Sequence, residues 1–237
     1  MRALLLGFLL LLVQLTTPAL ADDRRIVVEL FTSQGCSSCP KADRFITELA
    51  GRDDVIALAL HVEYWDYLGW KDEFASEVHS LRQRGYAAAA HSRTIYTPQF
   101  IVQGGIINPE SFRDGAFAGE VKRLVRLHAG RPEPVRLEVE RSGGMLAITV
   151  TAGDDAVGPA VIHVVRYMPE QTIRIRGGEN AGREITYSNI VTSWKALARW
   201  SGRDRMIVKA EAIGSDPIVV LVQADNHGPI LAARELR

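Results

Sequence analysis

The sequence predicts an α/β first half followed by an all-β, antiparallel second half that resembles a sandwich. A strand, a helix and a buried strand follow one another near the N-terminus. The hydrophobic pattern changes at a proline-rich link, Arg131–Pro134, and short apolar or alternating runs fill the rest of the chain. These two hydrophobic patterns indicate two domains, at residues 22–130 and 131–237.

The first half begins as a βαβ unit. Ile26–Phe31 is a short run rich in β-branched residues, which is typical of a strand. Apolar residues then recur at helical spacing from Ala42 to Leu49. Val55–Val62 is almost continuously apolar, as expected of a strand covered on both faces. We expect the two strands to pair in parallel through a right-handed crossover.

Two helices and a strand complete the first half. Phe74, Val78 and Leu81 repeat at helical spacing and predict the apolar face of a helix. Gln99–Gln103 predicts a strand that leads into a glycine hairpin turn. Residues 112–125 carry the last helix of this half.

The second half predicts the strands of an antiparallel sandwich, because turn residues separate its short runs. The runs are Val135–Glu140, Met145–Thr151, Ala160–Tyr167, Met206–Ile213, Ile218–Ala224 and Ile230–Leu236. Thr192–Trp200 is compatible with a strand or a helix. Gly177–Gly182 predicts a long turn, since it lacks the strand and helix that flank a phosphate-binding loop.

The N-terminus predicts a secretory signal peptide over residues 1–21. A basic start, the apolar stretch Ala3–Leu15 and the small residues Ala19 and Ala21 give the expected order. The alternative is an uncleaved anchor, but the apolar stretch is short for a membrane span. We therefore expect cleavage after Ala21, a periplasmic or secreted protein, and no membrane contact after cleavage. In such an oxidising compartment, two cysteines are expected to be paired or to exchange with other thiols.

The composition excludes several classes of protein. The chain has 28 basic and 28 acidic residues, so its charge gives no argument for nucleic acid or an anionic membrane as partner. Only 2 cysteines are present. That number excludes a disulfide-dense scaffold and a four-thiolate zinc site.

The two cysteines are placed where thiol chemistry is favoured. Cys36 and Cys39 flank Ser37-Ser38 at the start of the predicted helix. Unpaired backbone N–H groups at a helix start stabilise an anion, so they lower the pKa of a thiol at Cys36. Cys39 is close enough to resolve a mixed disulfide formed by Cys36. The alternative is a static bridge, although so short a loop constrains the unfolded chain little.

These features resemble the thioredoxin-fold oxidoreductases. The matching parts are the first strand, the CSSC at a helix start, the second strand and Thr97-Pro98 before Gln99–Gln103. The resemblance implies a cis-proline at Pro98 beside the cysteines, where the neighbouring backbone pairs with substrate. It also implies that Thr97, the preceding residue, helps to tune reactivity.

The whole mature chain resembles a bacterial family of secreted thioredoxin-like proteins of unassigned function. The resemblance rests on four motifs: ELFTSQGCSSCP (Glu29–Pro40), HVEYWDYLGWKD (His61–Asp72), YTPQ (Tyr96–Gln99) and GGENAGREITYSN (Gly177–Asn189). It implies a fold and a redox motif without a substrate.

Glu29 is the candidate for a proton-relay acid. Many thioredoxins carry a buried acid on the strand before the cysteines, and Glu29 lies near that position, offset by one residue. A buried carboxyl disfavours its charged form and is suited to move protons. The alternative is a strand-edge acid or a paired surface acid. Ser37-Ser38 departs from the Gly-Pro of reducing thioredoxins and the Pro-His of strong oxidants, so the direction of exchange stays open.

Two further features have alternative interpretations. The aromatic loop Tyr64–Trp70 follows a parallel strand. It predicts a rim that grips a polypeptide, a hydrophobic plug under a loop, or a surface packed against the second domain. His61 and His91 are candidate metal ligands with the cysteines, as in thioredoxin-fold copper-delivery proteins. A histidine at a strand end is more often simply hydrogen-bonded.

The sequence thus predicts an extracytoplasmic thiol–disulfide oxidoreductase that acts on protein thiols or disulfides. Cys36 is the nucleophile, Cys39 the resolving thiol and Pro98 the substrate-positioning residue. The redox-active cysteine pair serves without another cofactor, and an unidentified redox partner restores it. The rival interpretations are copper delivery and a binding module with an inert disulfide.

Overall fold

A computed structural model describes residues 24–107, 109, 111 and 115–237 of the chain. The predicted signal peptide, residues 1–21, lies outside this part. Among the described residues, no helix has the length and apolar character needed to cross a membrane.

The chain alternates strands and helices and then continues as strands. The first half contains β1 (Ile26–Thr32), α1 (Pro40–Ala50), β2 (Val55–His61), the short 3-10 helix η1 (Asp66–Leu68), α2 (Glu77–Ala89), β3 (Gln99–Val102), β4 (Gly105–Ile106) and α4 (Phe117–Ala129). The second half contains β5 (Val135–Ser142), β6 (Met145–Ala152), β7 (Ala160–Arg174), β8 (Glu184–Trp200), β9 (Met206–Glu211), β10 (Ile218–Ala224) and β11 (Ile230–Leu236).

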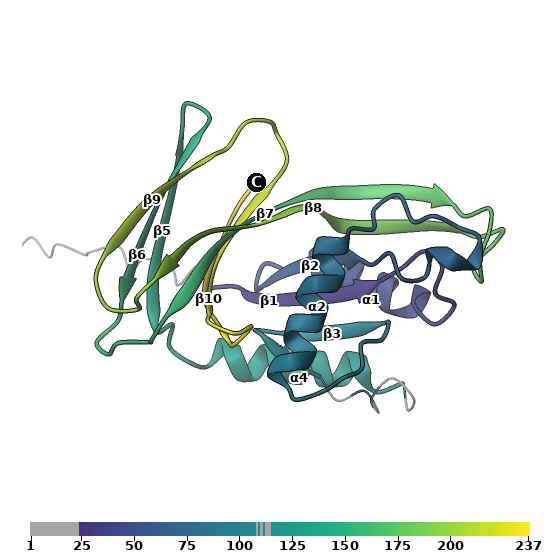
Figure 1. Ribbon diagram of the computed structural model, residues 1–237, viewed down its shortest axis with the longest axis horizontal. Helices are drawn as coiled ribbons and strands as arrows, with labels where there is room; N and C mark the ends of the chain where they lie inside the picture. Colours follow the sequence, from purple (N-terminus) through teal and green to yellow (C-terminus); the bar gives the residue numbers. More distant parts are fainter. Residues whose placement is uncertain (1–23, 108, 110, 112–114) are drawn as a thin grey trace, which may run out of the picture.

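One large sheet runs through both halves. Its eight strands follow the order β11-β10-β7-β8-β2-β1-β3-β4. β1 and β2 are parallel, which confirms the predicted pairing. β8 joins β2 where Ile190 lies opposite Ala59. The expected boundary at residue 130 falls between α4 and β5, but the large sheet continues across it (Figure 1).

Three apolar cores hold the layers together. On one face of the large sheet, α1 and α4 pack against β1, β2 and β3 through residues such as Phe45, Leu49 and Phe100. The opposite face packs with Tyr86 of α2. The remaining strands, β5-β6-β9, form a three-stranded sheet. This small sheet encloses the third core with β7, β10 and β11, as Figure 1 shows at the end away from the helices.

Helix α2 faces inward with polar residues. The predicted apolar face was wrong, because Val78 is 46% and Leu81 55% exposed. The buried side chains of α2 include His79, Arg82 and Gln83. They are buried because they bond to polar groups of the sheet and neighbouring loops, which apolar spacing does not reveal.

β7 and β8 form a hairpin longer than the sequence predicted. The expected strand Ala160–Tyr167 extends to Arg174, and Thr192–Trp200 is the end of a strand that begins at Glu184. The outer part of this hairpin is half-exposed, so it carries no apolar pattern. The hairpin extends over the first half of the chain to the far end of the molecule (Figure 1).

Candidate functional site

The two cysteines form a disulfide at the start of α1. Cys39 is the N-cap residue and Pro40 the first helical residue, so the proline replaces an N–H that has no acceptor within the helix. The Cα atoms of Cys36 and Cys39 are 5.4 Å apart. Both cysteines are 0% exposed, whereas Ser37 and Ser38 between them are exposed. The predicted position of the pair is confirmed, and its complete burial was not foreseen.

The Thr97–Pro98 segment lies beside residues Cys36–Cys39, here called the disulfide loop. The Ser38 hydroxyl is 3.3 Å from Cys36 Sγ and donates to the Thr97 carbonyl at 3.5 Å. The Thr97–Pro98 peptide bond is cis. Trp65 Nε1 donates to Thr97 Oγ1 at 2.8 Å, so the aromatic loop supports this segment. The structure therefore brings together the residues that the sequence singled out here.

An open cavity of about 600 Å³ adjoins these residues. Ser38, Lys41, Tyr96, Pro98 and Phe117 contribute to its wall. The wall is mostly apolar, and among the described lining residues Lys41 at the helix start is the basic one. This cavity offers room for a bound side chain next to the disulfide loop.

Glu29 lies away from the cysteines. Side chains alternate along β1, so Glu29 shares the face of Val27 and Phe31, opposite α1. Arg82 Nε donates to Glu29 Oε2 at 2.6 Å, and Arg82 Nη2 donates to Oε1 at 3.0 Å. Tyr86 adds a hydrogen bond at 2.6 Å. Glu29 is a buried, paired acid on the other side of the sheet, so its expected relay role is not supported and it leaves the candidate site.

Asp43 is the buried acid on the cysteine side of the sheet. It follows Cys39 by one helical turn, and its N–H donates to the Cys39 carbonyl at 3.0 Å. The Thr32 hydroxyl donates to Asp43 Oδ1 at 2.6 Å. Burial raises the pKa of Asp43 to about 7, against the lowering effect of that hydrogen bond. Sequence reasoning missed this residue, although its spacing from Cys39 on an amphipathic helix was a usable signal.

A buried His–Asp pair continues this polar region. His61 Nδ1 and Asp72 Oδ2 are 2.7 Å apart, and the Gln34 N–H also donates to Asp72 Oδ2 at 2.8 Å. Burial disfavours the ionised form of Asp72, but the interactions with His61 and the hydrogen bonds from the Gln34 and Phe74 N–H groups together outweigh burial and lower the pKa. Asp43 Oδ2 and His61 Nε2 are among the buried side-chain atoms of the described residues that have no hydrogen-bond partner.

The alternative metal site does not assemble from these residues. His61 is buried against Asp72, whereas His91 is exposed at the end of α2. In the described part of the chain, no group of three or more His, Cys, Asp or Glu side chains is arranged to hold a metal ion.

The turn between β7 and β8 covers the disulfide loop. Asn180 Nδ2 donates to the carbonyls of Gln34 at 3.0 Å and Cys36 at 2.7 Å. The Ser37 N–H donates to Glu179 Oε2 at 3.0 Å, and hydrogen bonding by the Ser37 side chain together with this N–H lowers the pKa of Glu179. The sequence predicted a long turn here, but nothing in it placed the turn on residues 144 positions earlier.

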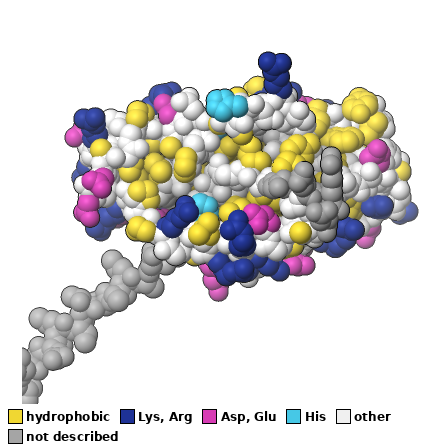
Figure 2. Space-filling view, turned by 90° about the horizontal axis from the view of Figure 1, so that it is seen from below, with side chains coloured by type: hydrophobic (Ala, Val, Ile, Leu, Met, Phe, Trp, Pro, Cys, Tyr) yellow, Lys and Arg dark blue, Asp and Glu magenta, His cyan; other side chains and the backbone are white. Residues whose placement is uncertain are grey.

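The fold and site together define an α/β protein with a covered disulfide at a helix start. The surface carries interspersed basic and acidic side chains on the face shown in Figure 2. Residues 27–223 match the model of the family described as "Protein of unknown function (DUF1223)", so the chain belongs to this family.

A solved structure is similar to this chain over most of its length. An X-ray crystal structure of a protein from Agrobacterium tumefaciens is 30% identical, with a TM-score of 0.74 over 91% of this chain and 95% of that chain. The superoxide reductase from Nanoarchaeum equitans is 15% identical over 44% of this chain and 92% of its own, with a TM-score of 0.24, too low to support an argument. No curated protein matches the chain.

Proposed function

We propose that this protein is an extracytoplasmic thiol–disulfide oxidoreductase that acts on protein substrates. The observation that carries the proposal is the Cys36–Cys39 disulfide at the start of α1, beside the Thr97–Pro98 segment and an open cavity. Cys36 is the nucleophile and Cys39 the resolving thiol. Thr97 and Pro98 position the substrate chain in the cavity.

The exchange runs through a mixed disulfide. When a substrate dithiol is oxidised, its thiolate attacks Cys36 Sγ, the Cys36–Cys39 bond breaks, and Cys39 leaves as a thiolate. The second substrate thiolate then attacks the substrate sulfur of the mixed disulfide and releases Cys36. Two electrons and two protons pass to the protein, and a partner disulfide must remove them. In the reverse direction, the reduced pair opens a substrate disulfide.

Asp43 is the proton carrier for Cys39 in this proposal. It lies one turn along the same helix, its carboxyl is buried, and its pKa of about 7 lets it exchange a proton near neutral pH. It takes the part that the sequence assigned to Glu29.

A mixed-disulfide trap tests the proposal. With Cys39→Ala, the resolving thiol is missing, so covalent adducts should accumulate on Cys36 and disappear on addition of dithiothreitol. The matched control is Cys36→Ala, which retains one thiol but lacks the nucleophile. An equal absence of adducts in both variants, isolated from the compartment where the protein resides, would contradict the proposal.

A static structural disulfide is the second candidate, because both cysteines are fully buried. The reduction potential separates the two functions. Disulfides that resist reduction have potentials below about −300 mV, whereas catalytic pairs lie higher. A potential below that value in redox-buffered dithiothreitol would favour the static bridge.

A further inference from the structure

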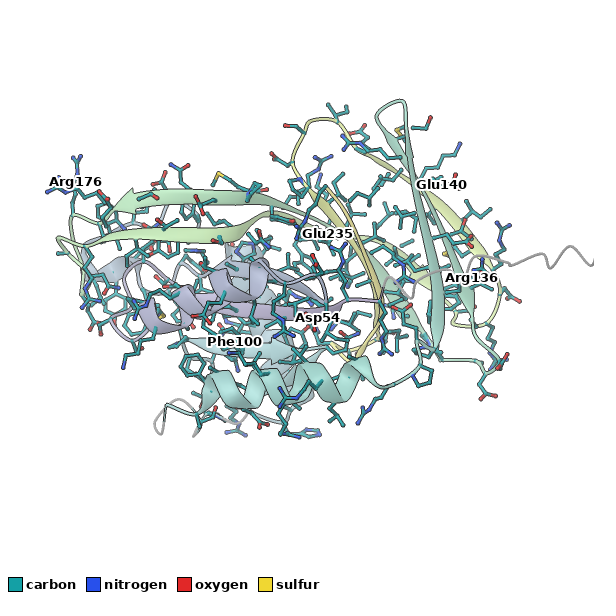
Figure 3. The ribbon with its side chains drawn as sticks, turned by 180° about the vertical axis from the view of Figure 1, so that it is seen from behind. Asp54, Phe100, Arg136, Glu140, Arg176 and Glu235 are labelled. Atoms are coloured by element: carbon teal, nitrogen blue, oxygen red, sulfur yellow. A yellow bond between two sulfur atoms is a disulfide. The ribbon has the colours of Figure 1, made fainter. Side chains whose placement is uncertain are left out.

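The segment Ile175–Arg183, here called the hairpin tip, joins β7 to β8 at the far end of the molecule. Its base is closed by hydrogen bonds of 2.9 Å from the Ile175 N–H to the Arg183 carbonyl and from the Gly182 N–H to the Ile175 carbonyl. Figure 3 shows Arg176 at this extremity, pointing away from the body. The hairpin tip is therefore a defined turn and is set apart from the cores.

Two neighbouring side chains attach the hairpin tip to the disulfide loop. Asn180 is 1% exposed and uses its amide N–H groups on the Gln34 and Cys36 carbonyls. Glu179 is exposed and accepts the Ser37 N–H. Cys36 is thus enclosed by groups that lie more than 140 residues away in the sequence.

Glycine backbone makes the rest of the contact. A Cβ atom at Gly177 would lie 2.6 Å from the Gly69 carbonyl oxygen. Gly178 has a φ of +68°, and a Cβ there would lie 3.3 Å from Trp70 Cβ and 3.7 Å from Gly35 Cα. The hairpin tip therefore rests on the disulfide loop and on Gly69–Trp70 through glycine backbone contacts and a few hydrogen bonds, and its one buried apolar side chain is Ile175.

The outer part of the hairpin has no strand partner outside the hairpin itself in the described part of the chain. β10 pairs with β7 only as far as Arg166. In the described part of the chain, the stretch Glu170–Arg174 pairs with Glu184–Ser188 alone. A two-stranded ribbon without further partners is marginally stable. The buried apolar side chains of this region are Ile175 and Tyr187, and Tyr187 packs against His61 and Phe74. Local opening is expected in the segment beyond Tyr187, because such contacts are few there.

We propose that the hairpin tip is a gate over the Cys36–Cys39 pair, held closed by Asn180 and Glu179. The gate lifts as a unit when Asn180 releases the two carbonyls, and exchange with an external thiol takes place only in the open form. It closes over both redox forms, so it sets the rate of exchange and leaves the equilibrium unchanged. This inference rests on the proposed function, for which it supplies the control of access.

The rate of reduction by dithiothreitol tests the gate on the full mature protein. Asn180→Ala removes two buried hydrogen bonds and should accelerate reduction about tenfold or more, since each such bond holds the closed form. Glu179→Ala should accelerate it severalfold, and its exposed side chain makes unfolding a negligible effect. Arg176→Ala, on the same turn but pointing outward, is the matched control and should stay within twofold of the parent.

Reoxidation by oxidised dithiothreitol completes the experiment. A gate speeds reduction and reoxidation by the same factor, so the equilibrium with dithiothreitol should stay within twofold. The gate is overturned if Asn180→Ala and Glu179→Ala react at the parental rate, or if only the equilibrium moves. The assay needs no protein substrate. If Cys39→Ala captures no adducts but the Asn180 and Glu179 variants react faster, only the proposed function is rejected. If Cys39→Ala captures adducts but the variants react at the parental rate, only the gate is rejected.

Discussion

At the scale of single residues, Asp43 links the cysteine site to pH. Its carboxyl is completely buried one turn from Cys39, and its hydrogen bond with Thr32 satisfies one oxygen. An acid in the first turn of a helix normally indicates an exposed group that favours the helix dipole. Here it lies on the buried face instead, so its protonation is coupled to folding.

The coupling gives a stability prediction for Asp43→Asn. The unfolded carboxyl titrates near 3.9, whereas burial raises the pKa of Asp43 to about 7 in the folded chain. The folded chain holds the proton longer, so the stabilisation from this group is complete below about pH 4 and lost as pH rises through 7. The Asp43→Asn variant should not show this pH-dependent loss of unfolding free energy, which amounts to roughly 4 kcal/mol at most in the parent protein. Urea unfolding of both proteins at pH 4 and pH 8 measures it, and parallel pH profiles would contradict it.

The Glu29–Arg82 pair gives a second prediction. Arg82→Met leaves the buried Glu29 carboxylate without its cation and should cost about 3–5 kcal/mol of unfolding free energy. Arg52→Met removes the surface pair with Asp54 and should cost less than about 1 kcal/mol. Adding Glu29→Leu to Arg82→Met should recover part of the loss, because no charge is then left buried. The idea fails if the two single variants have the same urea midpoint.

At the scale of elements, α2 shows that apolar residues at helical spacing are not always the buried ones. Leu81 fits the predicted apolar face but is exposed, while Leu49 of α1 is buried in the core. Leu81→Ala should change the unfolding free energy by less than about 0.5 kcal/mol. Leu49→Ala should cost about 2–5 kcal/mol. Equilibrium unfolding in urea compares them, and an equal loss in both would contradict the packing of α2.

The helices and strands of the first half were predictable because local patterns define them. β1, α1 and β2 follow from β-branched runs and helical spacing, and the cysteine loop follows from its place between them. The outer hairpin and the polar face of α2 have no such pattern. Their positions depend on partners distant in sequence, such as Gln34 for Asn180 and Glu29 for Arg82. A single sequence does not show these pairs.

At the scale of the whole molecule, β8 ties the two halves into one sheet. Ile190 pairs with Ala59 of β2, and Asn189 Nδ2 donates to the Ala57 carbonyl at 2.9 Å. Without β8, the apolar strand β2 would present an open edge, which is a hazard for aggregation. We therefore expect the first half to depend on β8 for its stability.

This dependence predicts the behaviour of a truncated chain. Residues 22–130 produced alone should aggregate or remain unfolded, whereas residues 22–237 should unfold in one cooperative transition. Circular dichroism and size-exclusion chromatography distinguish these outcomes. A monomeric fragment with a sharp thermal transition of its own would show that the first half is an independent domain.

The distance in sequence between Cys36 and Asn180 also determines when each residue is synthesised. The chain is made from the N-terminus at about 5–20 residues per second. The 144 residues that separate the two therefore take roughly 7–30 s to be synthesised. During synthesis, the cysteines leave the ribosome well before the amide that will cover them. Each newborn molecule thus passes through an interval in which its thiols are open to any oxidant, before its own C-terminal half closes over them.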